Sequence, residues 1–390
     1  MGTPVTCPSA ERSVSSPSPL FVTGTLRSGT TLLEKLLCSH PDMSVLYQPL
    51  FPRMIAAKRA FLASIGLSGE PLPLSHYFGE ERYHPGQLTS FLDHRQFSLR
   101  ELDPALEPAA QADGPLFQPR VLGEWLHESY WSLRHRDAPL LYGAKEVLCE
   151  EFAPHLLNSG FKVLLVLRDP RDVLTSLNFG RGAEFGGRPR PTLFNLQNWR
   201  KSVAFALHLE SHPAFLWLRY EDLALRRDST LSRIAAFLGL SPEPWFAGDF
   251  VIHDQSGLPW SGNSSHQEMP EVTGDSVFRF ESRLSVETIA LAEAVCEPEM
   301  RELGYERRTK NISLEQALSE FREAVVIDRA EFDPLYSSAP RQVALELERS
   351  RTLDDPKSSS RTGPLFLFPE LKARLRSTPV AASAAKDAPA

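Results

Sequence analysis

The sequence has no long run of apolar residues and few cysteines, and both absences limit what the protein can be. None of its stretches reaches the roughly 20 apolar residues that a membrane-spanning helix needs. Its cysteines lie far apart, without the close pairs of a zinc site, at positions Cys7, Cys38, Cys149 and Cys296. We therefore expect reduced thiols in a cytoplasmic protein, with neither a disulfide framework nor a bound metal.

The chain also lacks an excess of positive charge. Its 49 acidic residues outnumber its 42 lysines and arginines, which gives a formal net charge of -7. Because no overall positive field would recruit a polyanion, broad binding to nucleic acid is not expected. The first 19 residues lack the apolar core of a signal peptide, and their proline and serine content predicts a disordered tail. This interpretation is preferred although Gly2 and Thr6 match the loose myristoylation pattern.

A glycine loop follows the first apolar run, LFVT, and precedes a helical pattern of leucines. It nearly matches the nucleotide-binding P-loop, G-x-x-x-x-G-K-[ST]. Gly24 and Gly29 have the right spacing, and Thr31 fills the last place. Thr30 stands where a P-loop has lysine, and the basic residue, Arg27, lies earlier in the loop. A loop of this kind presents backbone N–H groups and the positive end of a helix to an anion, so it predicts a phosphate site.

A second strand-to-helix junction lies in the stretch VLLVLRDPRDVLTSL. Arg168 leaves the carboxyl end of an apolar strand, where ligands bind in open parallel sheets. Asp169 suits the cap of the next helix and Pro170 its first position, and Ser176 follows within that helix. Two interpretations stay open for this segment alone. It is either an anion site or a capped helix with a surface ion pair among Arg168, Arg171 and Asp172.

Repeated units of apolar strand, loop and helix predict an α/β fold of the P-loop-like, three-layer kind. Its central parallel sheet is expected to carry helices on both faces. Composition divides the chain into a disordered tail, a main domain, a helical extension and a linker-like, largely disordered tail, at residues 1–19, 20–305, 306–350 and 351–390.

Together, the loop TGTLRSGTTLL and the junction LLVLRDPRDVLTSL resemble those of sulfotransferases that use 3'-phosphoadenosine 5'-phosphosulfate (PAPS), of the bacterial and Golgi type. The resemblance implies transfer of the sulfuryl group from PAPS to a hydroxyl or amine of a small-molecule or carbohydrate acceptor. The bisphosphate PAP would then leave, and no metal would be needed. Arg168 and Ser176 would bind the 3'-phosphate, and the loop residues that would bind the 5'-phosphosulfate are Arg27, Ser28, Gly29, Thr30 and Thr31. The arginine within the loop suits a donor without the β- and γ-phosphates that the usual lysine contacts.

Further matches extend the resemblance over residues 20–305. Tyr220, in LRYEDL, corresponds to a tyrosine near the adenine nucleotide. The stretch WSGNSSHQ resembles a loop that closes near the 3'-phosphate, which would add Gly262, Asn263 and Ser264. Residues 51–119 and a lid at 179–191 are expected to shape the acceptor site. The family likeness also allows a homodimer.

The resemblance implies catalysis by Arg27 and by Lys145, a lysine at a strand end in YGAKEV. The general base is where the sequence departs from the pattern, because Gln48 stands where many members have glutamate and Val147 where others have histidine. Glutamine cannot accept a proton at neutral pH, and general base catalysis is typically worth about 10²- to 10⁴-fold. Another residue acts as the base, the acceptor is already nucleophilic, or Gln48 only orients it. If another residue is the base, the candidates are Glu34, His84, His127 and Glu146.

Two other functions stay open. A P-loop kinase of a small molecule would share the glycine loop, but its lysine and a strand-borne carboxylate for magnesium are not evident. A catalytically silent protein that binds PAPS or PAP would account for Gln48.

Overall fold

The structure, a computed structural model, describes most of the chain. The described residues are 17–67, 83–103, 118–178, 190–247, 251–252, 258–260, 274–323, 339–357 and 362–376. Within them, no helix has both the length and the apolar character needed to span a membrane.

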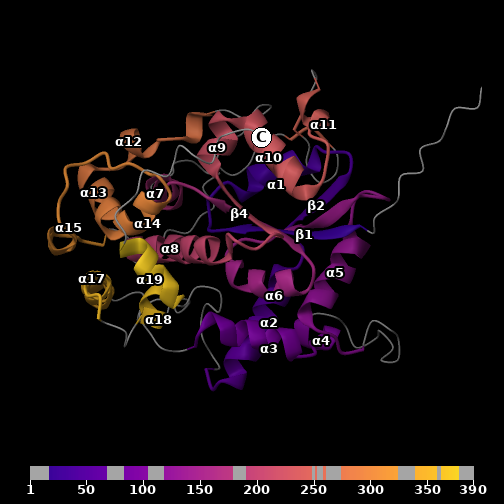
Figure 1. The fold of residues 1–390 in the computed structure, drawn as a ribbon, viewed down its shortest axis with the longest axis horizontal. Helices are drawn as coiled ribbons and strands as arrows, with labels where there is room; N and C mark the ends of the chain where they lie inside the picture. Colours follow the sequence, from indigo (N-terminus) through magenta and orange to yellow (C-terminus); the bar gives the residue numbers. More distant parts are fainter. Residues whose placement is uncertain are drawn as a thin grey trace, which may run out of the picture.

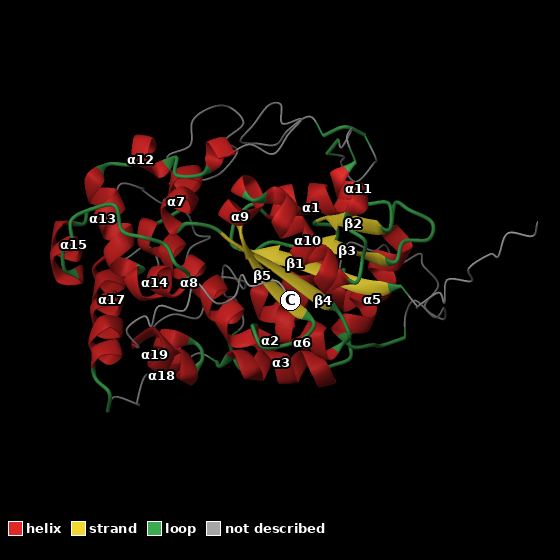
Figure 2. Ribbon diagram, turned by 45° about the horizontal axis from the view of Figure 1, so that its top comes forward, coloured by secondary structure: helices red, strands yellow, loops and turns green. Residues whose placement is uncertain are grey.

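A five-stranded sheet forms the centre of the molecule, and every strand pairs in parallel with its neighbours (Figure 2). The strand order is β2-β3-β1-β4-β5. In chain order the strands are β1 (Ser18–Gly24), β2 (Met43–Tyr47), β3 (Leu141–Lys145), β4 (Lys162–Leu167) and β5 (Phe215–Arg219). The α/β fold predicted from the sequence is confirmed.

Helices cover both faces of the sheet, because parallel strands require crossover connections (Figure 1). On one face, packed around the smaller of two apolar clusters, lie α1 (Thr30–Cys38), α9 (Tyr220–Leu225), α10 (Arg227–Leu238) and α11 (Glu243–Phe246). The larger cluster fills the other face, with α2 (Phe51–Ser64), α3 (Pro85–His94), α4 (Leu99–Leu102), α5 (Leu122–Leu133), η2 (Glu150–Phe152), α6 (Ala153–Asn158), α7 (Pro170–Asn178) and α8 (Thr192–Leu209).

The larger cluster continues into the C-terminal part of the chain. The elements there are η3 (Gly274–Ser276), α12 (Phe280–Arg283), α13 (Val286–Val295), α14 (Glu297–Glu302), α15 (Leu314–Glu320), α17 (Ala339–Asp354), α18 (Thr362–Phe366) and α19 (Pro369–Arg376). The expectation of a linker-like, disordered tail from residue 351 is therefore wrong for residues 362–376. Leu365, Leu371 and Leu375 are 2%, 2% and 3% exposed and belong to the larger cluster. The polar stretch DDPKSSSRTGP is typical of a linker, but the apolar residues that follow it have helical spacing.

Candidate active site

The two sequence motifs meet at the carboxyl edge of the sheet, where β1 and β4 end side by side. Arg27 Nε donates a hydrogen bond to Ser176 Oγ at 2.7 Å, across 149 residues of chain. Arg168 Nη1 donates to the backbone oxygen of Arg27 at 3.1 Å. The cations and hydroxyl predicted from separate segments thus form one cluster.

The glycine loop has a conformation that its glycines make possible. Gly29, which caps α1, has φ of 97°, and a Cβ atom placed on it would lie 2.2 Å from Tyr220 Cδ2. Tyr220 therefore packs against the loop at a distance that only glycine permits. Ser28 closes the turn, because its Oγ donates to the backbone oxygen of Thr25 at 2.7 Å. Thr30 and Thr31 follow as the first residues of α1.

Arg168 is held by a segment that sequence reasoning did not single out. Its Nη2 donates to the backbone oxygen of Ser276 at 2.5 Å, and its guanidinium lies 4.5 Å from the centre of the Tyr220 ring. Asp172 fixes this segment to α7 by accepting from the backbone N–H groups of Phe278 and Phe280 at 2.8 and 3.0 Å. Burial raises the pKa of Asp172 to about 6, although the charge of Arg168 opposes the shift.

Arg171 does not form a surface ion pair. It is 1% exposed, and its guanidinium bridges Asp169, at 2.6 Å, and Glu293 of α13, at 2.5 Å. Asp169 also accepts from the backbone N–H of Arg171 at 2.9 Å, which confirms its predicted role at the start of α7. The interpretation as a surface pair is wrong for Arg171, because Glu293, which lies 122 residues away along the chain, pairs with it in the interior. Arg168 does lie 3.9 Å from Asp172, but this ion pair is buried as well.

Lys145 and Gln48 lie together at the ends of two neighbouring strands, β3 and β2. Lys145 Nζ donates to Gln48 Oε1 at 3.3 Å and lies 3.5 Å from the centre of the Tyr47 ring. Burial lowers the pKa of Lys145 to about 8, and the charges of Glu34 and Glu146 oppose the shift only in part. The pKa of Arg27 is also lowered, first by burial and then by Arg168, while Tyr47 opposes the shift. Tyr47, which the sequence motifs do not include although it precedes Gln48, thus interacts with both catalytic candidates.

Two family models match the chain on separate segments. One, described as "Sulfotransferase family", covers residues 19–85, and the other, described as "Sulfotransferase domain", covers residues 147–304. The first includes the glycine loop and the second the junction at Arg168.

The chain belongs to the sulfotransferase family.

Solved sulfotransferase structures resemble the chain at low identity. The sulfotransferase domain from the curacin biosynthetic pathway is 18% identical, with 75% of this chain and 99% of that chain covered and a TM-score of 0.41. The domain from the Synechococcus PCC 7002 olefin synthase is 19% identical, with 72% and 96% covered and a TM-score of 0.37. Mouse sulfotransferase SULT7A1, complexed with PAP, is 12% identical, with 74% and 86% covered and a TM-score of 0.37. No curated protein matches the sequence.

The candidate bases of this sulfotransferase domain all have structural partners. His84 caps α3 by accepting from the backbone N–H of Gly86, and His127 contacts the hydroxyl of Tyr142 at 2.7 Å. Glu34 pairs with Lys35 at 3.0 Å. Glu146 accepts from the backbone N–H of Leu50 at 3.0 Å, and burial raises its pKa to about 8. Glu34 and Glu146 are the two whose charges act on Lys145.

Part of the predicted sulfotransferase site lies outside the described residues, namely Gly262, Asn263 and Ser264, together with residues 179–189 of the expected lid. In the part of the chain that the structure describes, no group of three or more His, Cys, Asp or Glu side chains is placed to hold a metal ion.

Proposed function

We propose that the chain transfers the sulfuryl group of PAPS to a hydroxyl or amine of a small-molecule or carbohydrate acceptor, with PAP as the other product. One observation carries the proposal. Arg27 in the glycine loop binds Ser176 of the second junction at 2.7 Å, and Arg168 binds the backbone of Arg27 at 3.1 Å. A donor with phosphates at both its 5' and 3' positions suits a site in which two anion-binding segments adjoin.

Each segment would bind a different part of PAPS. The glycine loop and the positive end of α1 would bind the 5'-phosphosulfate, with hydroxyl donors from Thr30 and Thr31. Arg168 and Ser176 would bind the 3'-phosphate. Adenosine triphosphate has no 3'-phosphate, so this division distinguishes the proposed donor from the donor of a kinase.

The cations supply the chemistry by stabilising the leaving group. In an in-line transfer, negative charge grows on the oxygen between phosphate and sulfate, and fixed cations lower the energy of that transition state. Arg27 and Lys145 would be these cations, and Lys145 is protonated below its pKa of about 8. Gln48 acts as an orienting residue, since its Oε1 accepts from Lys145 Nζ at 3.3 Å and its amide nitrogen can donate to an acceptor.

The first test compares the thermal stability of the protein with PAP and with magnesium-ATP. A ligand at a hundred times its dissociation constant adds about 2.7 kcal/mol of stability. We expect PAP to stabilise the protein and Arg168→Ala to abolish the effect. Arg95→Ala is the control, because Arg95 pairs with Glu101 at the surface, at the end of α3. Stabilisation by magnesium-ATP alone would overturn the proposal in favour of a kinase.

A second experiment separates an enzyme from a silent binding protein. Radiolabelled PAPS is incubated with the protein and a panel of alcohols, amines and sugars, and the release of PAP is measured with the appearance of label on the acceptor. Transfer that is lost in Lys145→Met but retained in Arg95→Ala supports catalysis. Tight PAP binding without transfer to any acceptor class supports the silent alternative, which Gln48 favours.

A further inference from the structure

Helix α8 contacts the candidate active site and the C-terminal helices through adjacent residues. Trp199 Nε1 donates to the backbone oxygen of Arg168 at 2.7 Å, and Trp199 is 0% exposed. The next residue, Arg200, is 2% exposed and pairs with Glu346 of α17 at 2.5 Å. The two contacts lie one residue apart on the same rigid helix, so a displacement of α8 would change both.

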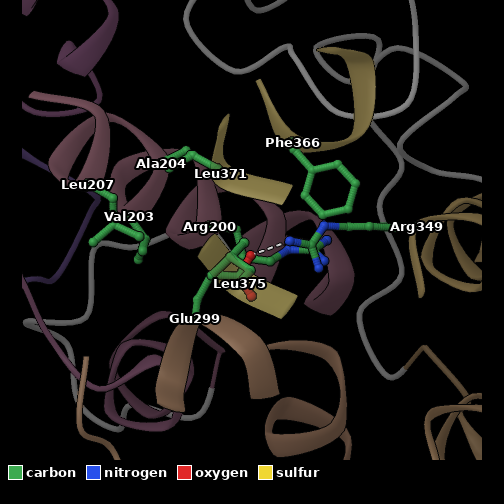
Figure 3. A pocket seen from close by; sticks show the side chains of 9 residues that line it. All are labelled: Arg200, Val203, Ala204, Leu207, Glu299, Arg349, Phe366, Leu371 and Leu375. Atoms are coloured by element: carbon green, nitrogen blue, oxygen red, sulfur yellow. Dashed lines mark hydrogen bonds and ion pairs between the residues drawn. The ribbon is translucent and has the colours of Figure 1, made fainter. Parts of the chain in front are cut away.

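The C-terminal helices hold α8 at several further points. Gln197 Nε2 donates to Gln342 and Glu346 at 2.6 and 2.9 Å. At the other end of α8, Arg374 of α19 pairs with Glu210 at 2.6 Å. Figure 3 shows the contact region, where Arg349 points to Glu299 and shares a pocket with Arg200, lined also by Phe366, Leu371 and Leu375. These helices therefore fix the position of α8 against the main domain.

The peptide group between Arg168 and Asp169 is bound at both ends. Its carbonyl oxygen accepts from Trp199 at 2.7 Å, and its N–H donates to Glu221 Oε1 at 2.8 Å. Glu221 is in turn held by the hydroxyl of Tyr305 at 2.9 Å. Because a peptide group is planar, two opposed hydrogen bonds fix its rotation and with it the direction in which the Arg168 side chain leaves the backbone.

We propose that Trp199 is a positioning residue for Arg168, and that the helices α17 to α19 keep it in place through α8. Without the indole hydrogen bond, the peptide plane is free to rotate about its remaining contact with Glu221. The guanidinium of Arg168 then spends less time directed at a bound 3'-phosphate. The effect on nucleotide binding rests on the proposed function, whereas the effect on the peptide group does not.

The matched variants Trp199→Phe and Trp125→Phe test the positioning role of Trp199. Trp125 is also buried, at 1% exposed, and donates to the backbone oxygen of Phe97 at 2.8 Å, in the helices beneath the sheet. Both variants remove one indole donor from a buried carbonyl, so both should lose similar stability. We expect only Trp199→Phe to weaken PAP binding, by about tenfold, because a less well-placed Arg168 would lose about one hydrogen bond's worth of its interaction with the 3'-phosphate.

The variant Arg374→Ala tests the C-terminal helices. Arg374 is partly exposed and contacts Glu210 and the backbone oxygen of Leu207 at the end of α8, so its loss should leave the protein folded. We expect a several-fold rise in the dissociation constant of PAP, with Arg95→Ala unchanged. A PAP affinity in Trp199→Phe equal to that of the unaltered protein, with the fold intact, would overturn the proposal.

Hydrogen exchange of the ligand-free protein gives a readout that needs no nucleotide. The amide of Asp169 should exchange faster in Trp199→Phe than in the unaltered protein, and at an unchanged rate in Trp125→Phe. If the unaltered protein does not bind PAP, the proposed function fails, but the exchange rate still decides whether Trp199 positions the peptide group. Unchanged exchange at Asp169 would refute that role, and faster exchange with unchanged PAP affinity would refute its link to binding.

Discussion

The pairing of Lys145 with a neutral glutamine gives the site a distinctive pH dependence. Burial places the pKa of Lys145 near 8, well below its ordinary value of 10.5. In the proposed mechanism the lysine must carry its proton to stabilise the leaving group, so kcat/KM should fall as the pH rises through about 8. Gln48→Glu places a carboxylate 3.3 Å from the amine, which raises the pKa of Lys145 and should move the fall upward by about one unit or more.

The same pH range contains a second group, Glu146, whose pKa burial raises to about 8. Glu146→Gln is therefore the control for the pH profile. A fall that persists in Glu146→Gln, at a lower pH because the Glu146 charge no longer raises the pKa of Lys145, and that moves to higher pH in Gln48→Glu belongs to Lys145. If Gln48→Glu does not change the pH at which kcat/KM falls, the catalytic role of Lys145 is contradicted.

Gly29 offers a second test at the scale of one residue. Alanine there would adopt a left-handed backbone, which costs about 1–3 kcal/mol, and its Cβ would also collide with Tyr220. Gly160 has φ of 83°, but a Cβ atom at that position would meet nothing within 4 Å, so Gly160→Ala carries the backbone strain alone. We expect Gly29→Ala to lower the melting temperature more than Gly160→Ala does. Stabilisation by PAP should be abolished in Gly29→Ala and retained in Gly160→Ala. Equal behaviour of the two variants would argue against a close-fitting loop.

Among the structural elements, α19 carries the sharpest correction to the sequence-based expectations. Leu371 is 2% exposed, so Leu371→Ala should reduce the free energy of unfolding by about 2–5 kcal/mol. Leu133, at the end of α5, is 51% exposed, and Leu133→Ala should change the free energy of unfolding by less than about 0.5 kcal/mol. Denaturation with urea measures both values. A Leu371→Ala protein as stable as the unaltered one would mean that α19 does not pack on the core.

The strands and the two strand-to-helix junctions were predictable because each depends on a short segment. An apolar run followed by a glycine loop, or by Arg-Asp-Pro, determines its local conformation largely by itself. The contacts of Arg168 were not predictable, because Ser276 and Trp199 reach it, and Glu221 reaches the N–H of the next residue, from distant parts of the chain. The buried pair of Arg200 with Glu346 was not predictable either, because its partners are far apart in the sequence and charged residues are mostly exposed.

At the scale of the whole molecule, the reactivity of three buried thiols can report unfolding on both faces of the sheet. Cys38 lies in the smaller apolar cluster, whereas Cys149 and Cys296 lie in the larger one. Burial raises the pKa of each thiol well above its ordinary value, so all three should be unreactive in the folded protein. In a Cys7→Ser variant, we expect the three to become reactive at a common urea concentration. Labelling of Cys296 at a lower urea concentration than Cys38 and Cys149 would show that the C-terminal helices unfold separately from the sheet.

The buried pair of Arg200 and Glu346 has a consequence for the order of events during synthesis. The partners are separated by 146 residues, so at about 5–20 residues per second the ribosome needs roughly 7–30 s to supply the glutamate after the arginine. During that interval α8 has a cation on a surface that α17 has yet to cover. A nascent chain halted before residue 346 would therefore be a better substrate for chaperones and proteases than its complete set of strands suggests.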